Sequence, residues 1–219
     1  MVYTRWAEGL GLDWVRLNVA TEIETTDNPA RREGPKRSEA SKLAILAAAR
    51  EELTEHGWRG FSPDRLAKRA KASKQTIYRW WPSVAAIAVE AAIAVIDEPK
   101  YVQNETLDVR MSHFIDPIAN LARAGDGAHL LRSALLAAAD DAHAGEVFRH
   151  WFNSKFRNPL KTLLAEAAMR GQIKRDYDID AVSEMLFGPV WHRLVMMRGP
   201  LPQVIALRAA QYVVTALRP

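Results

Sequence analysis

One short polar stretch of the sequence, KQTIYR, carries side chains that suit contact with nucleic acid. Gln75 and Thr76 can donate to and accept from base edges, which is how proteins distinguish one base pair from another. Lys74, Tyr78 and Arg79 can donate hydrogen bonds to phosphate oxygens, and such bonds position a protein on a duplex. The stretch therefore combines the two kinds of contact that sequence-specific DNA binding requires.

These side chains need a short, rigid element to present them, and the flanking residues predict a helix. Ser73 can cap its first turn, and Pro82 makes continuation beyond its last turn difficult. Ile77 and Trp81 lie four residues apart, so both fall on one side of the helix. We expect that side to be buried and the polar residues to point away from it.

A second short helix is predicted just before this one. Ser62 can cap the free N–H groups of its first turn, Pro63 suits the first helical position, and Asp64 favours the positive end of the helix dipole. A turn at Lys71 then separates the two helices. Two short helices joined by a three- to four-residue turn are typical of the helix-turn-helix. An ordinary basic helical hairpin remains the alternative at this point.

The positive charge of the chain is concentrated in the same region. Residues 31–82 hold 13 Lys and Arg against 6 Asp and Glu, whereas residues 1–30 are net acidic and residues 83–219 are neutral. The net charge of the whole chain is only +4. A localised excess indicates polyanion binding, with a merely solvated basic face as the alternative. We interpret the basic cluster within residues 31–37 as an arm, although a solvated tail fits it equally well.

The whole chain reads as helical. A first helix is predicted from Ser38 to His56, with Gly57 as its C-cap, and a fourth begins after Ser83 and is apolar on most sides. Prolines inside two later helices, Pro117 and Pro159, predict kinks or breaks. The remaining helices are expected at about 101–123, 127–142, 144–170, 178–198 and 201–217. No strand pattern competes, so the fold class is predicted as all-α.

Several classes of function are excluded by what the sequence lacks. The chain has no cysteine, so disulfides, Cys-type zinc sites and thiol nucleophiles are ruled out. The spacing of His143 and His150 is not a metal signature, and no Gly-rich phosphate loop or HExxH motif occurs. No apolar run approaches the roughly 18 residues of a membrane span, and the start does not read as a secretory signal. We therefore expect a soluble cytoplasmic protein that is not an enzyme and needs no metal or cofactor.

The C-terminal half is expected to provide dimerisation and a ligand pocket. A single helix-turn-helix contacts too few base pairs to select a genomic site, so we expect a homodimer on a palindromic operator. The apolar faces of the last two predicted helices would form the interface, unless they pack only within one subunit. These faces comprise Val182, Met185, Leu186, Val190 and Leu194 on one helix, and Val204, Ile205, Leu207, Val213, Val214 and Leu217 on the other. Candidate pocket residues are polar or aromatic: His113, Phe114, Trp151, Phe152, Phe187 and Trp191, each of which core packing also explains.

Two segments resemble the TetR family of transcriptional regulators. "SKQTIYRWWPS" is close to the family's Ser-Lys-x-Thr-(Leu/Ile)-Tyr-x-x-Phe-Pro-Ser pattern, and "MLFGPVWHRLVMMRGPL" resembles the regulatory domain of one branch. The resemblance begins near Ser38 and implies a three-helix DNA-binding domain over 38–83 and a helical regulatory and dimerisation domain over 84–219. Residues 1–37 would form a flexible arm.

The resemblance also implies roles for individual residues and shows two departures. Ser62 and Thr76 would approach phosphates or base edges, Gln75 a base edge and Tyr78 a phosphate, with Lys74 beside the DNA backbone. The family usually has glycine where this chain has Lys71, and lysine where it has Val84. A non-glycine residue in the turn must tolerate a left-handed backbone at a cost of about 1 kcal/mol, unless the turn adjusts. The predicted DNA-binding set is Ser62, Lys71, Ser73, Lys74, Gln75, Thr76, Tyr78 and Arg79.

The sequence thus predicts a transcriptional regulator that binds double-stranded DNA. The resemblance implies a homodimeric repressor that a small-molecule effector releases from its operator. A ligand-independent architectural DNA-binding protein is the alternative; it explains the basic segment but not the neutral, apolar second half.

Overall fold

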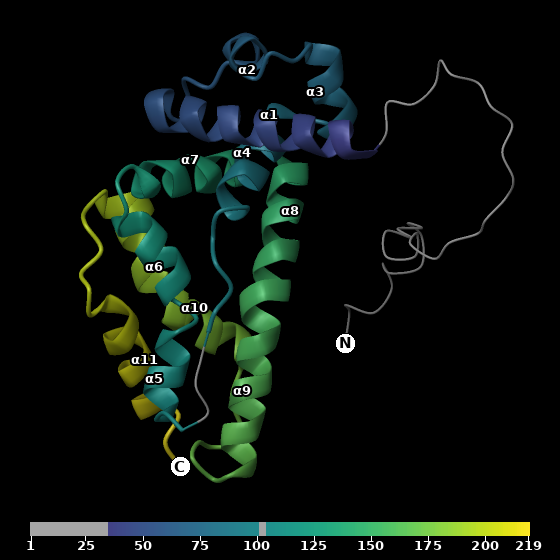
Figure 1. Ribbon diagram of the computed structural model, residues 1–219. Helices are drawn as coiled ribbons and strands as arrows, with labels where there is room; N and C mark the ends of the chain where they lie inside the picture. Colours follow the sequence, from purple (N-terminus) through teal and green to yellow (C-terminus); the bar gives the residue numbers. More distant parts are fainter. Residues whose placement is uncertain (1–34, 101–103) are drawn as a thin grey trace, which may run out of the picture. The chain divides into compact units, whose positions relative to one another are not determined.

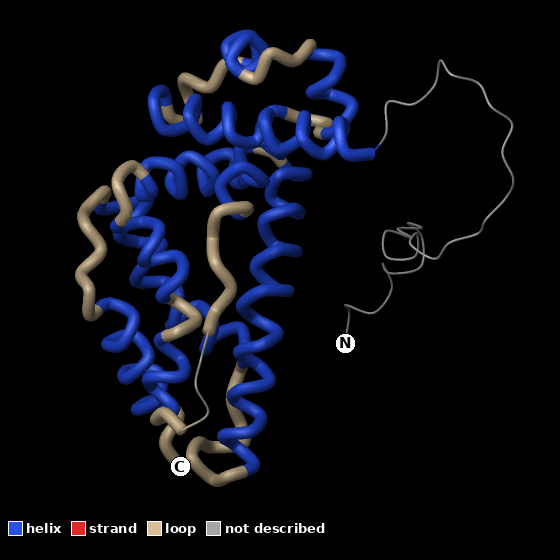
Figure 2. The backbone as a smooth tube through the Cα atoms, viewed as in Figure 1, coloured by secondary structure: helices blue, strands red, loops and turns tan. Residues whose placement is uncertain are grey.

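The computed structural model of the protein describes residues 35–100 and 104–219, and every regular element in these ranges is a helix (Figures 1 and 2). The predicted all-α fold class is therefore confirmed. The predicted flexible arm falls largely outside the described residues. Within these ranges, no helix has both the length and the apolar character needed to cross a membrane.

Three helices form the N-terminal part: α1 (Pro35–His56), α2 (Pro63–Arg69) and α3 (Lys74–Trp80). Helix α1 begins at Pro35, earlier than the predicted Ser38, but ends at His56 as expected. Gly57 follows with φ +67°, a left-handed conformation that a glycine C-cap adopts without steric cost. Trp58 and Phe61 pack against the core of this part, with ring centroids 6.2 Å apart.

Helix α4 (Val84–Ile93) begins where the sequence predicts, with the Ser83 hydroxyl accepting a 3.2 Å hydrogen bond from Ala86 N. It is almost wholly buried, as its apolar composition indicates. It ends at Ile93, although the apolar run continues to Ile96. Composition alone does not mark this end, because no proline or glycine stands there.

Seven further α-helices follow, two of them extended by π-helical turns. The predicted helix over 101–123 is two helices, because Pro117 lies in the first turn of the second. At Pro159 the helix continues through a π-helical turn, which shifts the hydrogen-bond register ahead of a residue that has no N–H. The elements are α5 (Leu107–Ser112), α6 (Asp116–Arg123), α7 (Gly127–Asp140), α8 (Ala142–Phe152), η1 (Asn153–Arg157), α9 (Asn158–Met169), α10 (Ile179–Trp191), η2 (His192–Met197) and α11 (Ile205–Ala216).

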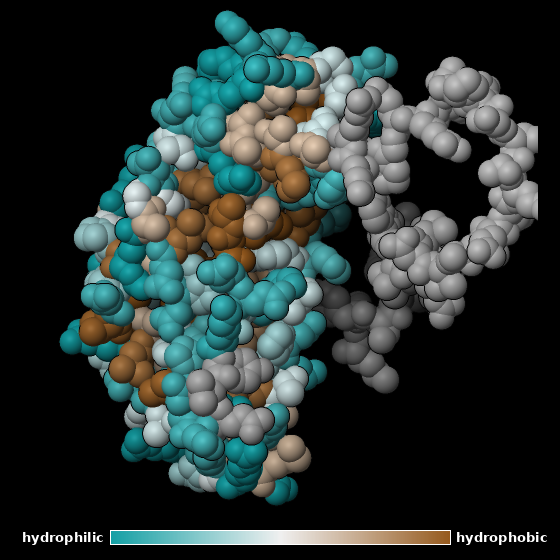
Figure 3. Space-filling model, in the orientation of Figure 1, coloured by the Kyte–Doolittle hydropathy of each residue, from teal (hydrophilic) through white to brown (hydrophobic). Residues whose placement is uncertain are grey.

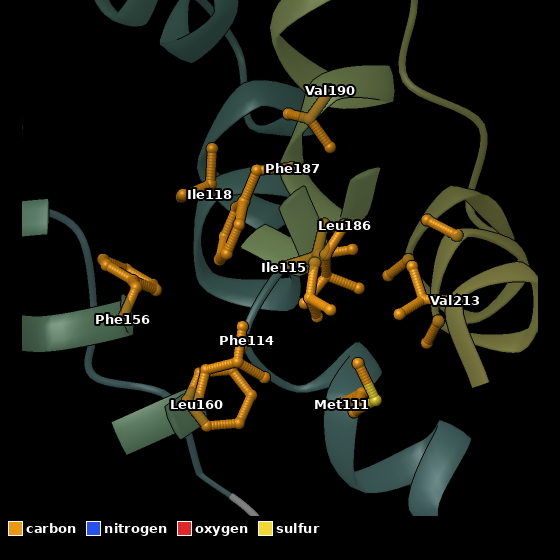
Figure 4. Close-up of a cluster of buried hydrophobic side chains, with 14 of the residues drawn as sticks. Met111, Phe114, Ile115, Ile118, Phe156, Leu160, Leu186, Phe187, Val190 and Val213 are labelled. Atoms are coloured by element: carbon orange, nitrogen blue, oxygen red, sulfur yellow. The ribbon is translucent and has the colours of Figure 1, made fainter. Parts of the chain in front are cut away.

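Two hydrophobic clusters hold these helices together. The first joins α1–α4 to the inner sides of α7 and the start of α8, and includes Leu53, Ile77 and Leu130. The second fills the space between α5, α6 and α9–α11; Figure 4 shows Ile115 beside Leu186, with Val213 of α11 across from them. The first cluster contains residues on both sides of the predicted domain boundary, such as Trp81 before it and Ala85 after it. The hydrophobic core is therefore continuous across this boundary. The division at 83/84 stays a prediction.

Candidate nucleic-acid interface

Helix α3 has one buried side and one polar, exposed side. Ile77 and Trp81 are 1% and 3% exposed and share a cluster with Leu66 of α2, so they hold α3 against the rest of the motif. Lys74, Gln75, Tyr78 and Arg79 are exposed on the other side, and 47% of Tyr78 is accessible. This is the orientation that the sequence predicts, and it leaves amide, phenol and cationic groups available to a duplex.

The start of α3 is fixed by a serine cap. The Ser73 hydroxyl accepts a 3.0 Å hydrogen bond from Thr76 N, and the two hydroxyl oxygens lie 2.9 Å apart. Ser73 is thus occupied in capping, which stabilises α3 by about 1 kcal/mol. Thr76 is half-buried beside it. Of the predicted DNA contacts, these two hydroxyls are already hydrogen-bonded to the motif itself.

Lys74 is also engaged within the motif. Its ammonium lies 2.5 Å from Oδ1 of Asp64, the acid in the first turn of α2. The hydrogen bond and the charge of Asp64 raise the pKa of Lys74 above its ordinary value. A phosphate that contacts Lys74 must therefore compete with this carboxylate.

The turn between α2 and α3 places Lys71 in the left-handed region. Its φ is 50°, whereas Ala70 before it has φ −74°. Ala72 N donates to Ala67 O at 3.0 Å, and Lys71 N donates to Lys68 O at 3.3 Å, which together close the end of α2. The predicted departure is confirmed: a lysine occupies a backbone conformation that suits glycine.

A buried carboxylate that the sequence did not single out anchors α2. Glu52 of α1 is 0% exposed, and its Oε1 accepts hydrogen bonds from Ser62 N at 3.3 Å and from Arg65 Nε at 2.7 Å. Arg65 Nη2 lies 2.6 Å from the same oxygen. The Ser62 hydroxyl accepts from Arg65 N at 3.4 Å. One side chain of α1 thereby fixes both the cap and the first turn of α2.

A second arginine of α2, Arg69, pairs with carboxylates of α1. Arg69 donates to both carboxylate oxygens of Glu55, at 2.7 and 2.6 Å, and to Glu51 at 3.2 Å. The hydrogen bond from Arg69 lowers the pKa of Glu55, and the pKa of Arg69 is correspondingly raised. Two of the cations that suggest DNA binding in the sequence, Arg65 and Arg69, therefore hold α2 on α1. The sequence feature that indicates these ion pairs is the group of three acidic residues, Glu51, Glu52 and Glu55, within about one turn of α1.

The end of α3 is tied to α4 and α1 through Glu90. Its Oε2 accepts a 2.5 Å hydrogen bond from the indole N–H of Trp81, and its Oε1 lies 2.8 Å from Lys42 Nζ. Lys42 Nζ is also 5.9 Å from the Trp81 ring centroid, within cation–π range. Helix α3 and helix α4 are thus linked by a side-chain contact as well as by the short loop between them.

The α1–α2 turn contacts α7 of the C-terminal part. The indole N–H of Trp58 donates to Oδ2 of Asp140 at 2.7 Å. A Cβ added at Gly57 would lie 3.1 Å from the His129 ring, so the turn approaches α7 closely. Helices α1–α3 are therefore held by contacts to both α4 and α7.

The predicted pocket residues divide into two groups. Rings from α8, η1 and α10 pack together at centroid separations of 4.9–6.3 Å, which brings Trp151, Phe152, Phe187 and Trp191 into one cluster with Phe148 and Phe156. Phe114 is fully buried in the hydrophobic core that this cluster joins. These rings pack against one another and fill the space between the helices. Phe148 is half-buried like Trp151 and Phe152, and it was not among the predicted residues.

His113 lies elsewhere. Its Nε2 is 2.8 Å from Glu105 and its Nδ1 is 3.1 Å from Asp116, so both ring nitrogens face carboxylates. It lines a separate hollow of about 380 Å³ together with Asp97 and Lys100. Among the residues described, no group of three or more His, Asp or Glu side chains is arranged to hold a metal ion.

The region from α10 to α11, including η2 and the segment before α11, carries six of the ten exposed large apolar side chains among the described residues. The residues predicted to face a partner are largely buried in the chain's own core instead: Val182, Leu186, Val190, Leu194, Ile205, Val213 and Leu217. That part of the prediction was wrong, because periodicity identifies an apolar face but not what covers it. Three residues of the predicted faces, Met185, Val204 and Leu207, do lie on the outward side of this region, together with Met196, Met197 and Tyr212.

Comparison with known families matches both parts of the chain. A model for bacterial regulatory proteins of the tetR family matches residues 45–91. A model described as tetracyclin repressor-like, C-terminal domain, matches residues 104–213. The two models together cover the helix-turn-helix and most of the helices that follow it.

Individual relatives and solved structures agree with these matches. The HTH-type transcriptional regulator YdeS of Bacillus subtilis is 29% identical over 166 residues, which is 74% of this chain and 82% of the relative. The DNA-binding transcriptional repressor TetR of Mycobacteroides abscessus is 28% identical over 186 residues, covering 83% and 95%. The structure of FadR from Bacillus subtilis in complex with stearoyl-CoA has a TM-score of 0.60 at 17% identity, covering 80% of this chain and 99% of that one. At that identity the likeness shows the fold alone.

Proposed function

The chain belongs to the TetR family of DNA-binding transcriptional regulators, and on that premise we propose that it is a homodimeric repressor that a small molecule releases from a palindromic operator. It would act in the cytoplasm, where a bacterial regulator meets its DNA. The observation that carries the proposal is the exposed side of α3, with Gln75, Tyr78 and Arg79 outward and Ile77 buried beneath them.

The exposed groups divide by chemistry into base reading and phosphate contact. Gln75 can bond an adenine edge in a bidentate manner, which discriminates bases by about 1–3 kcal/mol. The Tyr78 hydroxyl and the Arg79 guanidinium are phosphate donors. Lys71 in the turn and Lys68 at the end of α2 are exposed cations that add to them. Arg65 and Arg69 contribute indirectly, because they hold α2 in place.

The outward apolar side of α10 and α11 supports dimerisation. Met185 lies one turn before Gly188, where an added Cβ would meet nothing within 4 Å, so another helix can approach closely there. Val204 and Tyr212 of the neighbouring segment are 47% and 72% exposed. Isolated apolar side chains are ordinary on a surface, but six large ones exposed between Met185 and Tyr212 support a subunit interface at the last helix pair.

The contacts to α4 and α7 support ligand control. The bonds from Trp81 to Glu90 and from Trp58 to Asp140 link the helix-turn-helix to the C-terminal helices. A ligand that prefers one arrangement of those helices changes DNA affinity by its differential affinity for the two states. Repression and release by this route are what we propose for the chain.

A gel-shift titration with the DNA upstream of the chain's own gene tests the proposal. We expect specific binding that Gln75→Ala weakens by about 1–3 kcal/mol for the operator while leaving affinity for random DNA nearly unchanged. Gln172→Ala, the same change at an exposed residue in another segment, is the matched control. Equal affinity for operator and random DNA would instead support an architectural DNA-binding protein.

A further inference from the structure

An open groove of about 550 Å³ lies between α1 and the junction of α6 with α7. Its floor is apolar and includes Val95, Leu121 and Leu130, and 39% of Val95 is exposed. Figure 3 shows hydrophobic side chains gathered on this face, over α7 and the segment after α4. An apolar floor with charged groups at its edges is the usual composition of a small-molecule site.

The walls of the groove are acidic. Glu51 and Glu55 project from α1 and Asp126 stands at the start of α7, against one lining cation, Arg50. Glu55 is held by Arg69 through both oxygens. Glu51 is 63% exposed and has a single 3.2 Å hydrogen bond from Arg69. Asp126 precedes α7 without capping it, because its side chain makes no capping hydrogen bond.

We propose that this groove binds an organic cation with a bulky apolar body, and that such a cation is the effector of the regulator. The second clause rests on the function proposed above. The apolar floor suits the body of the molecule, and Glu51 with Asp126 suits its charge. A volume of about 550 Å³ lies within the range of small-molecule sites. Arg69 and Arg50 offset the charges of Glu55 and Glu51 on the α1 wall, so a carboxylate-bearing effector would be disfavoured chiefly by Asp126 on the opposite wall.

The groove adjoins the DNA-binding helices through the same carboxylates. Glu51 and Glu55 are the side chains that hold Arg69 of α2 on α1. A cation beside Glu51 therefore competes with Arg69 for that carboxylate. Occupation of the groove thus acts on the helix that precedes the recognition helix, and it does so without entering the packed aromatic cluster.

A pair of ions with the same size and shape but opposite charge tests the site. Binding of tetraphenylphosphonium and of tetraphenylborate to the full chain is measured by isothermal titration calorimetry in the absence of DNA. The chain carries a net charge of +4, so non-specific attraction favours the anion. We expect the cation to bind about tenfold more tightly or better. Equal binding, or tighter binding of the anion, would overturn the inference.

Substitutions locate the binding. Asp126→Asn is expected to weaken tetraphenylphosphonium binding about threefold to fivefold, and Val95→Lys about tenfold or more, because it places a cation at the floor. Asp97→Asn is the control: it changes the net charge equally at an exposed residue that lines the other hollow. The assignment would be contradicted if Asp97→Asn lost as much affinity for tetraphenylphosphonium as Asp126→Asn, and if Val95→Lys lost none. The calorimetric titration contains no DNA. Failure of the cation to bind would therefore not contradict the proposed DNA binding, and failure to bind the operator would not affect the result of this titration.

Discussion

The indole N–H of Trp58 donates a 2.7 Å hydrogen bond to Oδ2 of Asp140, joining the turn between α1 and α2 to the end of α7. The two residues are 82 positions apart in the sequence. Helix α7 also contributes Leu130 and Ala137 to the hydrophobic cluster of the helix-turn-helix. A shift of α7 therefore acts on the DNA-binding helices through both a polar contact and shared packing.

We expect this hydrogen bond to stabilise the fold and to behave as a pair. Trp58→Phe removes the donor and Asp140→Ala the acceptor, and each should lower the free energy of unfolding by about 1 kcal/mol in urea denaturation. The double variant should lose less than the sum of the two, whereas Asp140→Asn retains an acceptor oxygen and should lose less than Asp140→Ala. Additive losses would show that the two side chains do not interact.

The buried Glu52 should matter far more than its exposed neighbour. Glu52→Ala leaves Ser62 N without its acceptor and takes the carboxylate from Arg65, whose guanidinium keeps only Gly60 O, and we expect a loss of about 2–3 kcal/mol in the free energy of unfolding. Glu51→Ala, one residue away and largely exposed, should cost less than about 1 kcal/mol. Urea denaturation compares the two directly. Similar losses would mean that the buried carboxylate does not anchor α2.

Lys71 should have opposite effects on stability and on DNA binding. Lys71→Gly relieves the strain of the left-handed backbone at φ 50°, but glycine also adds conformational entropy to the unfolded chain. Because the first effect is the larger, we expect a net gain of about 0.5–1 kcal/mol in the free energy of unfolding. It should also weaken operator binding and reduce the salt slope by about one, because a phosphate contact is lost. Lys71→Ala removes the charge but keeps the strain, so it should weaken binding without the gain. An unchanged salt slope in both variants would remove Lys71 from the interface.

The Glu55–Arg69 pair should make stability depend on acid pH. Arg69 holds the pKa of Glu55 below its ordinary value of 4.5, so the contribution of the pair is present above that value and is lost as the pH falls through the lowered pKa. We expect the stability difference between the wild type and Glu55→Gln to be largest near neutral pH and to shrink on acidification. Chemical denaturation at a series of pH values measures it. A constant difference across the series would contradict the pairing.

The parts of this fold that local chemistry determines were predictable from the sequence. Ser62, Ser73 and Ser83 cap the helices they were expected to cap, and Lys71 takes the backbone conformation that its place in the turn demands. Each of these depends on residues a few positions away.

The contacts that were missed join residues that only the folded chain brings together. Glu52 meets Arg65 across two helices, Trp81 meets Glu90, and Trp58 meets Asp140 across much of the chain. Apolar periodicity likewise grouped the exposed Met185, Val204 and Leu207 with residues that α10 and α11 bury inside the chain, because it does not show which apolar side chains the chain itself covers. His113 was grouped with the aromatic residues, although its ring nitrogens face Glu105 and Asp116, which are near it in the sequence.

The central claim, that two copies of α3 read a duplex, is tested most directly by selecting bound sequences from a random double-stranded library and weighing the resulting complex. The account predicts an enriched inverted repeat with half-sites about one helical turn apart, bound by two chains. An unenriched pool, or a single chain bound to a site without two-fold symmetry, would contradict it.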